Sequence, residues 1–206
     1  MSSSDASTET TTETTSASPA SSTAAPAPAS LPRRRGSGRY RVIMVCTGNI
    51  CRSAMAEIVL NDRLVAAGLH MREPDGVVVT SAGVSDEERG NPIDSRARRV
   101  LAEAGYGTGA DDVSRATDIA ITSHAAHRIT DAEIAEADLL LAMTDSHWNI
   151  LQRRAAGLGE EPSRICMYRE FDPAAAPQTE AVAAGRASRG VLNVPDPWYG
   201  TMADFA

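Results

Sequence analysis

The segment 45–53 combines two cysteines and an arginine and reads Val-Cys-Thr-Gly-Asn-Ile-Cys-Arg-Ser. It follows a short apolar run and precedes a stretch in which apolar residues recur with helical spacing. A Gly-containing loop between a strand and a helix directs several backbone N–H groups toward one point, where they bind anions. A cysteine that opens such a loop, with an arginine at its end, predicts a nucleophile beside a bound phosphoryl group.

Each residue of this loop has an expected role. Cys46 is the expected nucleophile, because the N–H groups, the helix dipole and the Arg52 guanidinium all favour its thiolate form. Arg52 has a planar fork that can hold two phosphoryl oxygens, and Ser53 can hydrogen bond the sulfur when it leaves. Gly48 and Asn49 tolerate the positive φ that a tight turn needs. The residues expected to bind phosphate are Thr47, Gly48, Asn49, Ile50, Cys51 and Ser53. The alternative is that Cys46 is an inert, buried residue.

A second cluster lies near the end of the chain, where Asp196 is followed by Pro197, Trp198 and Tyr199. Transfer of a phosphoryl group from an ester needs an acid that protonates the leaving oxygen, and we expect Asp196 to be that acid. Pro195 and Pro197 keep the segment out of a helix. The two aromatic side chains can form a wall for a flat substrate. The alternative is an ordinary Asp-Pro turn.

Strands and helices that alternate along the chain would position these residues. Apolar, β-branched runs predict four strands, at 40–45, 77–80, 139–143 and 164–168. Helical spacing predicts three helices, at 53–67, 94–104 and 145–156, and a further helix start follows Thr130. This order predicts an α/β fold with a four-stranded parallel sheet flanked by helices, a three-layer architecture of Rossmann-like or flavodoxin-like type. Ligands of such sheets bind at the carboxyl ends of the strands, where Cys46 is expected to lie.

The composition divides the 206 residues into two parts. Of residues 1–30, 26 are Ser, Thr, Ala or Pro, which cannot bury enough apolar surface to fold. Three consecutive arginines at 33–35 close this segment, either as a solvated linker or as a docking patch for acidic partners. We therefore expect a disordered tail over 1–38 and one domain over 39–206.

The charge and cysteine content exclude several classes of protein. The chain has 20 basic residues, all of them Arg, against 27 acidic residues, and its net charge is −7. This charge, with only 4% aromatic residues, argues against nucleic-acid binding. No apolar run is long enough to span a membrane. Three cysteines are too few for a disulfide framework, so we expect a reducing compartment, the cytoplasm. We expect no metal, no cofactor, and a monomer or weak dimer.

Four motifs together resemble the low-molecular-weight protein-tyrosine phosphatase family. They are the loop at 45–53, Met-Ala-Glu at 55–57, Ser-Ala-Gly at 81–83 and Asp-Pro-Trp-Tyr-Gly at 196–200. The resemblance covers most of residues 40–205. It implies hydrolysis of phosphotyrosine in protein substrates, without metal, through a phosphocysteine on Cys46.

The resemblance also implies roles for residues around the nucleophile. Asn49, Ser81 and His124 match positions whose side chains brace the loop in the family, although His124 has a plain surface role as its alternative. Cys51 would form a reversible disulfide with Cys46 and protect it from overoxidation. The alternative for Cys51 is packing at the helix start.

Three other functions are alternatives. Arsenate reductases similar to this family need further cysteines downstream, and here Cys166 stands alone on the last predicted strand. Arginine phosphatases carry Thr where this chain has Ile50 and lack the paired aromatics, so Ile50, Trp198 and Tyr199 favour an aryl phosphate. The third alternative is an inactive phosphate-loop binding module.

The chain departs from the family pattern at several positions. Ala54 stands where a Pro is usual, and Thr144 where an Asp is usual. Glu87 and Glu88 occupy a loop where the family often places an aromatic wall, and acids facing the pocket would repel a phosphate dianion. Two loops are expected to be longer than the family's, at 107–123 and 174–194. The domain is expected to lack the family's terminal helix, through an incomplete sequence or a partner that supplies it.

Overall fold

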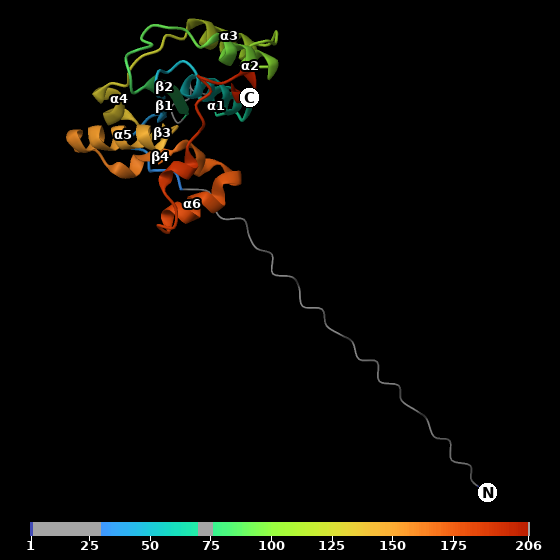
Figure 1. Ribbon diagram of the computed structural model, residues 1–206. Helices are drawn as coiled ribbons and strands as arrows, with labels where there is room; N and C mark the ends of the chain where they lie inside the picture. Colours follow the sequence, from blue (N-terminus) through green and yellow to red (C-terminus); the bar gives the residue numbers. More distant parts are fainter. Residues whose placement is uncertain (2–29, 70–75, 206) are drawn as a thin grey trace.

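The computed structural model describes residues 1, 30–69 and 76–205, and its centre is a sheet of four strands (Figure 1). The strands are β1 (Tyr40–Cys46), β2 (Val77–Gly83), β3 (Leu139–Ala142) and β4 (Ile165–Met167). They pair in parallel in the order β2-β1-β3-β4. The predicted α/β fold with a four-stranded parallel sheet flanked by helices is therefore confirmed.

Helices cover both faces of the sheet. They are α1 (Arg52–Ala66), α2 (Ser95–Glu103), α3 (Asp112–Ser123), α4 (Asp131–Glu136), α5 (Asp145–Leu158) and α6 (Ala176–Ala183). Alternate residues of β1 face opposite sides, as a pleated strand requires: Val42 and Met44 lie in one core cluster with α1, whereas Ile43 and Val45 lie in another with α4 and α5. No described helix is long and apolar enough to cross a membrane.

The strand register places the loop after β1 beside the ends of its neighbours. Cys46 pairs with Gly83 of β2, and Val45 pairs with Ala142 of β3. The chain leaves β1 for α1 at this edge. The strand order also reverses here, since β2 lies on one side of β1 and β3 on the other. This is the position where open parallel sheets bind ligands.

The two segments interpreted as long loops contain helices, so their assignment as loops is wrong, whereas their length relative to the family's loops stays a prediction. Within 107–123, α3 begins after Asp111, whose carboxylate accepts a 2.9 Å hydrogen bond from the Ser114 backbone N–H. Only Thr117 and Ile121 of α3 are buried, which left little apolar periodicity to detect. Within 174–194, α6 has no buried residue at all. The helix start at Thr130 is confirmed as a capping box with Glu133.

Part of the segment assigned to the tail contacts the domain. Most of that tail, residues 2–29, lies outside the described residues. Asp138, which is 3% exposed, accepts hydrogen bonds from the backbone N–H groups of Arg35 at 2.7 Å and of Arg41 at 2.8 Å. The Arg35 guanidinium also pairs with Glu160. The carbonyl of Pro32 accepts a 3.0 Å hydrogen bond from the Tyr40 hydroxyl. Arg35 is thus anchored to the folded unit.

Candidate active site

Cys46 lies at the end of β1, and the loop that follows it leads directly into α1. The Sγ atom of Cys46 is 3.0 Å from Oγ of Ser53, in the first turn of α1. Asn49 has φ of 61° and is the one non-glycine residue in the described part of the chain with positive φ. Gly48 does not have positive φ, so its expected role in the turn is wrong. Its small size matters instead, because a Cβ there would lie 2.7 Å from Cγ of Glu88.

A buried hydrogen-bond network connects this loop to β2 and to the segment after α3. Asn49 is completely buried, and its Nδ2 donates to Oγ of Ser53 at 3.1 Å and to Oγ of Ser81 at 2.8 Å. The Ser81 hydroxyl donates in turn to Oε2 of Glu57. His124 lies with its Nε2 at 2.7 Å from the Asn49 carbonyl oxygen. The structure thus brings Asn49, Ser81 and His124 together, and it adds Glu57, whose pKa is raised by burial.

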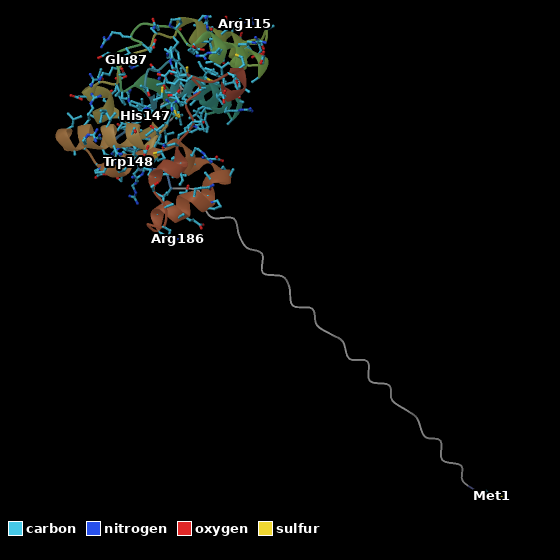
Figure 2. The ribbon with its side chains drawn as sticks, viewed as in Figure 1. Met1, Glu87, Arg115, His147, Trp148 and Arg186 are labelled. Carbon is cyan, nitrogen blue, oxygen red and sulfur yellow. The ribbon has the colours of Figure 1, made fainter. Side chains whose placement is uncertain are left out.

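His147 is a buried residue of the site that the sequence analysis missed. Its Nε2 lies 3.0 Å from Oγ1 of Thr47, and its Nδ1 lies 2.9 Å from Oγ1 of Thr144. Only 4% of the residue is exposed, and it lies within the body of the domain, whereas Glu87 lies near the surface (Figure 2). Burial, with the nearby Arg52 charge, lowers the pKa of His147 to about 4. A neutral imidazole therefore connects α5 to the loop. The feature of the sequence that could have indicated His147 is Thr144, which lies three positions earlier and caps the N-terminus of α5.

Arg52 and Asp196 lie side by side although 144 positions separate them in the chain. Nη2 of Arg52 donates to Oδ2 of Asp196 at 2.6 Å, and Nη1 donates to the Val194 carbonyl at 3.2 Å. The Arg52 side chain is 7% exposed and that of Asp196 is 43% exposed. The Nε–H of Arg52 is buried and has no hydrogen-bond partner among the described residues. Burying such a donor is costly unless a ligand satisfies it.

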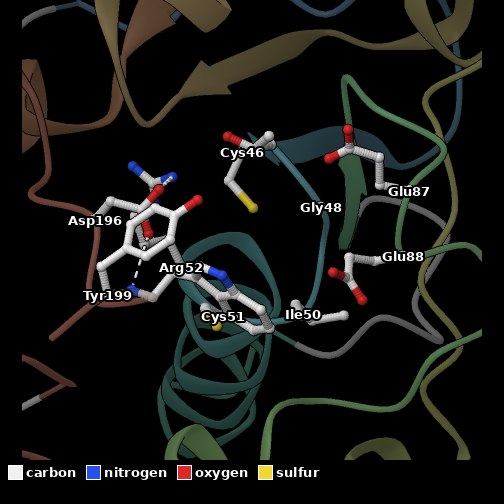
Figure 3. A pocket seen from close by; sticks show the side chains of 11 residues that line it. Cys46, Gly48, Ile50, Cys51, Arg52, Glu87, Glu88, Asp196 and Tyr199 are labelled. Carbon is white, nitrogen blue, oxygen red and sulfur yellow. Dashed lines mark hydrogen bonds and ion pairs between the residues drawn. The ribbon is translucent and has the colours of Figure 1, made fainter. Parts of the chain in front are cut away.

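These residues line one cavity of about 130 Å³, which Figure 3 shows from close by. Cys46 points into it, and Cys51 and Ile50 line it below Cys46 in this view. Trp198 and Tyr199 both line the cavity and are 38% and 93% exposed, and Tyr199 lies on the Asp196 side. The cavity is lined by Cys46, Thr47, Gly48, Ile50, Cys51, Arg52, Glu87, Glu88, Asp196, Trp198 and Tyr199.

The acidic pair and the second cysteine take defined places around this cavity. Glu87 and Glu88 face it from the side opposite Asp196 and Tyr199 (Figure 3). Cys51 is a free thiol, 5% exposed, and burial raises its pKa to about 12. No group of three or more His, Cys, Asp or Glu that could hold a metal ion occurs in the described ranges.

The fold and the site together define a class of enzyme. A free cysteine ends an inner strand of a parallel sheet, lies beside the first turn of a helix and shares its cavity with an arginine and a carboxylate. This arrangement is that of phosphatases that use a cysteine nucleophile in a phosphate loop.

The comparisons with known proteins agree with this class. The family model for low molecular weight phosphotyrosine protein phosphatases matches residues 41–206, and the chain belongs to that family. It is 36% identical over 167 residues to a low molecular weight protein-tyrosine-phosphatase of Streptomyces coelicolor, which covers 81% of this chain and 82% of that protein. It is 37% identical over 169 residues to low molecular weight protein-tyrosine phosphatase A of Mycobacterium tuberculosis, which covers 82% of each chain.

Two solved structures extend the comparison. The crystal structure of a low molecular weight protein tyrosine phosphatase from T. tengcongensis has a TM-score of 0.55 and 29% identity, and the match covers 81% of this chain and 87% of that one. The arginine phosphatase YwlE, solved as a Cys-to-Ser mutant with a phosphorylated active-site serine, has a TM-score of 0.53 and 26% identity, with 80% and 83% coverage. The relatives named as phosphatases are hydrolases.

Proposed function

We propose that this protein hydrolyses phosphotyrosine in protein substrates through a phosphocysteine on Cys46. The observation that carries this is the position of Cys46 Sγ in the cavity, 3.0 Å from the Ser53 hydroxyl and next to Arg52. The buried, unpartnered Nε–H of Arg52 supports a role in binding an anion. Backbone N–H groups of residues 47–52 complete the oxyanion cradle in this proposal.

The first chemical step transfers the phosphoryl group to the enzyme. The Cys46 thiolate attacks phosphorus, the S–P bond forms, and the P–O bond to the tyrosine ring breaks. Asp196 gives its proton to the departing phenolate oxygen. The 2.6 Å hydrogen bond between Arg52 and Asp196 holds the guanidinium and the carboxylate together before substrate binds. A bound phosphate dianion then replaces the carboxylate as the partner of Arg52 and frees Asp196 to act on the leaving oxygen.

The second step releases phosphate. Asp196 takes a proton from water, the water oxygen attacks phosphorus, and the S–P bond breaks. The Ser53 hydroxyl, which lies 3.0 Å from Sγ, stabilises the departing thiolate. The hydrogen bonds of Asn49 to Ser53 and Ser81 keep this hydroxyl in place during both steps.

The walls of the cavity support an aryl phosphate as substrate. Trp198 and Tyr199 line the cavity and can flank a flat ring, since aromatic pairs gain energy in offset or edge-to-face contact. Three free cysteines among the described residues support a reducing compartment, and we propose the cytoplasm as the location.

The experiment is a turnover assay with p-nitrophenyl phosphate and with phosphotyrosine, phosphoserine and phosphoarginine versions of one peptide. We expect turnover of the first two substrates, a loss of about 10⁴-fold or more for Cys46→Ser with both, and a loss of about 10²- to 10⁴-fold for Asp196→Ala with the phosphotyrosine peptide. Cys166→Ser, which changes a cysteine outside the cavity, is the matched control and should retain activity. A parent protein without turnover, or one unaffected by Cys46→Ser, would contradict the proposal. Preference for the phosphoarginine peptide would assign a different substrate.

A further inference from the structure

The acidic side of the cavity has no role in the chemistry proposed above. The loop after β2 carries Asp86, Glu87 and Glu88 in succession. Asp86 is neutralised, because Arg89 lies 2.8 Å away and Arg128 lies 3.6 Å away. The carboxylates of the two glutamates have no ion pair within the described residues. They are therefore uncompensated negative charges at the mouth of a site for an anion.

Hydrogen bonds hold this acidic loop in a fixed position against the phosphate loop. The backbone N–H groups of Val84 and Ser85 donate to the carbonyls of Cys46 at 2.9 Å and of Thr47 at 3.0 Å. The far end of the loop is tied down by a 2.7 Å hydrogen bond from the Gly90 N–H to the carbonyl of Ala126. The two carboxylates are thus carried by a loop that is anchored at both ends.

Glu88 is also fixed by its own side chain. Its Oε2 accepts a 2.6 Å hydrogen bond from Nδ2 of Asn91, which brings no charge. Its Cγ packs so closely on Gly48 that a Cβ on that glycine would lie 2.7 Å away. The Glu88 side chain therefore rests on the phosphate loop itself.

The balance of charge around the cavity indicates what the substrate must bring. Arg52 is taken up by the phosphoryl group in the proposed chemistry, so the carboxylates of Glu87 and Glu88 add two negative charges that face an incoming dianion. This repulsion opposes binding of an isolated aryl phosphate. A cationic side chain next to the phosphorylated residue would offset this repulsion by pairing with Glu87 and Glu88, on the side of the cavity opposite Tyr199 (Figure 3).

We propose that Glu87 and Glu88 determine sequence specificity and select phosphotyrosines that have Arg or Lys as a neighbour. This inference rests on the proposed function, since it names the class of phosphotyrosine that the same cavity accepts. An exposed pair of opposite charges changes affinity by roughly 1.4- to 5-fold, so two carboxylates predict a preference of about 2- to 30-fold. The preference should fall as salt is added, because exposed charges are screened.

The test compares kcat/KM for three phosphotyrosine peptides that differ only in the flanking residues, which are Arg, Gln or Glu. We expect the parent protein to prefer them in that order, and the double variant Glu87→Gln, Glu88→Gln to reduce the Arg-to-Glu ratio toward one. The matched control is Glu103→Gln with Glu136→Gln, which removes the same charge from exposed positions outside the cavity. The control should keep the parent's ratio.

The outcomes separate this inference from the proposed function. Equal kcat/KM for the three peptides in the parent protein, or an equal fall of the ratio in the control, would overturn the inference and leave the phosphatase activity standing. A parent protein that hydrolyses none of the peptides would overturn both. A second measurement needs no variant: the ratio of kcat/KM for the Arg and Glu peptides is determined for the parent protein at increasing salt concentration. A ratio that stays constant as salt rises would also overturn the inference.

Discussion

Acidification should destabilise this protein through one buried side chain, that of His147. The imidazole is 4% exposed and lies between the hydroxyls of Thr47 and Thr144. Burial, together with the Arg52 charge, lowers its pKa from the ordinary 6.5 to about 4. The folded state therefore favours the neutral ring. The stability that this provides is present above pH 6.5 and is lost as the pH falls toward the folded value.

The size of the effect follows from the two pKa values. The difference between 6.5 and about 4 corresponds to ~3 kcal/mol in total. Between about pH 7 and about pH 5, the linked protonation of His147 lowers the free energy of unfolding by ~2 kcal/mol. For a chain of this size, a change of that magnitude shifts the melting midpoint by about 4–8 °C.

The assay is urea denaturation at both pH values for the parent protein and for His147→Gln. Glutamine does not titrate, whereas every other titrating group is shared by the two proteins and cancels in the comparison. We expect the free energy of unfolding of the parent to fall by ~2 kcal/mol more than that of the variant. Equal losses in the two proteins would refute the reasoning, because they would mean that His147 titrates alike in the folded and unfolded states.

Three further predictions concern the loop after β1 and the proposed acid, Asp196. Gly83→Ala should destabilise the protein by about 1–3 kcal/mol and raise KM, because the new Cβ would lie 2.5 Å from the Thr47 carbonyl oxygen; an unchanged urea midpoint and KM would contradict this. Cys51→Ser should keep basal turnover, but thiol reductant should no longer restore activity after peroxide treatment, since no disulfide with Cys46 can form; recovery equal to the parent's would exclude the protective role. Asp196→Asn should slow substrates with poor leaving groups far more than p-nitrophenyl phosphate, and equal losses would argue against an acid at this position.

Local sequence was sufficient to predict the parts of the fold that depend on local periodicity and capping. The four strands, α1 and the capping box at Thr130 were all predicted with boundaries within a few residues. Their signals are apolar runs, helical spacing and short-range side-chain hydrogen bonds, which a single sequence displays. The phosphate loop was predicted on the same basis, because it is contiguous from Cys46 to Ser53.

The residues that sequence analysis missed act through contacts between distant segments. His147 reaches Thr47 across 100 positions, and its own neighbourhood in the chain reads as the first turn of an ordinary surface helix. The contact of Glu88 with Gly48 likewise depends on how β2 lies beside β1. The helix α3 was missed for another reason, since its few buried positions give almost no apolar pattern.

The most direct test of the covalent mechanism is to trap the phosphoryl group on Cys46. The protein is mixed with a phosphotyrosine peptide, denatured at alkaline pH within the first turnover because the S–P bond is labile in acid, digested and analysed by mass spectrometry. The mechanism predicts one phosphoryl group on the peptide that contains Cys46, more of it in Asp196→Ala when the second step becomes slower, and none in Cys46→Ser. Full turnover with no phosphorylated Cys46 peptide at any quench time, or phosphate found on another residue, would contradict the central claim.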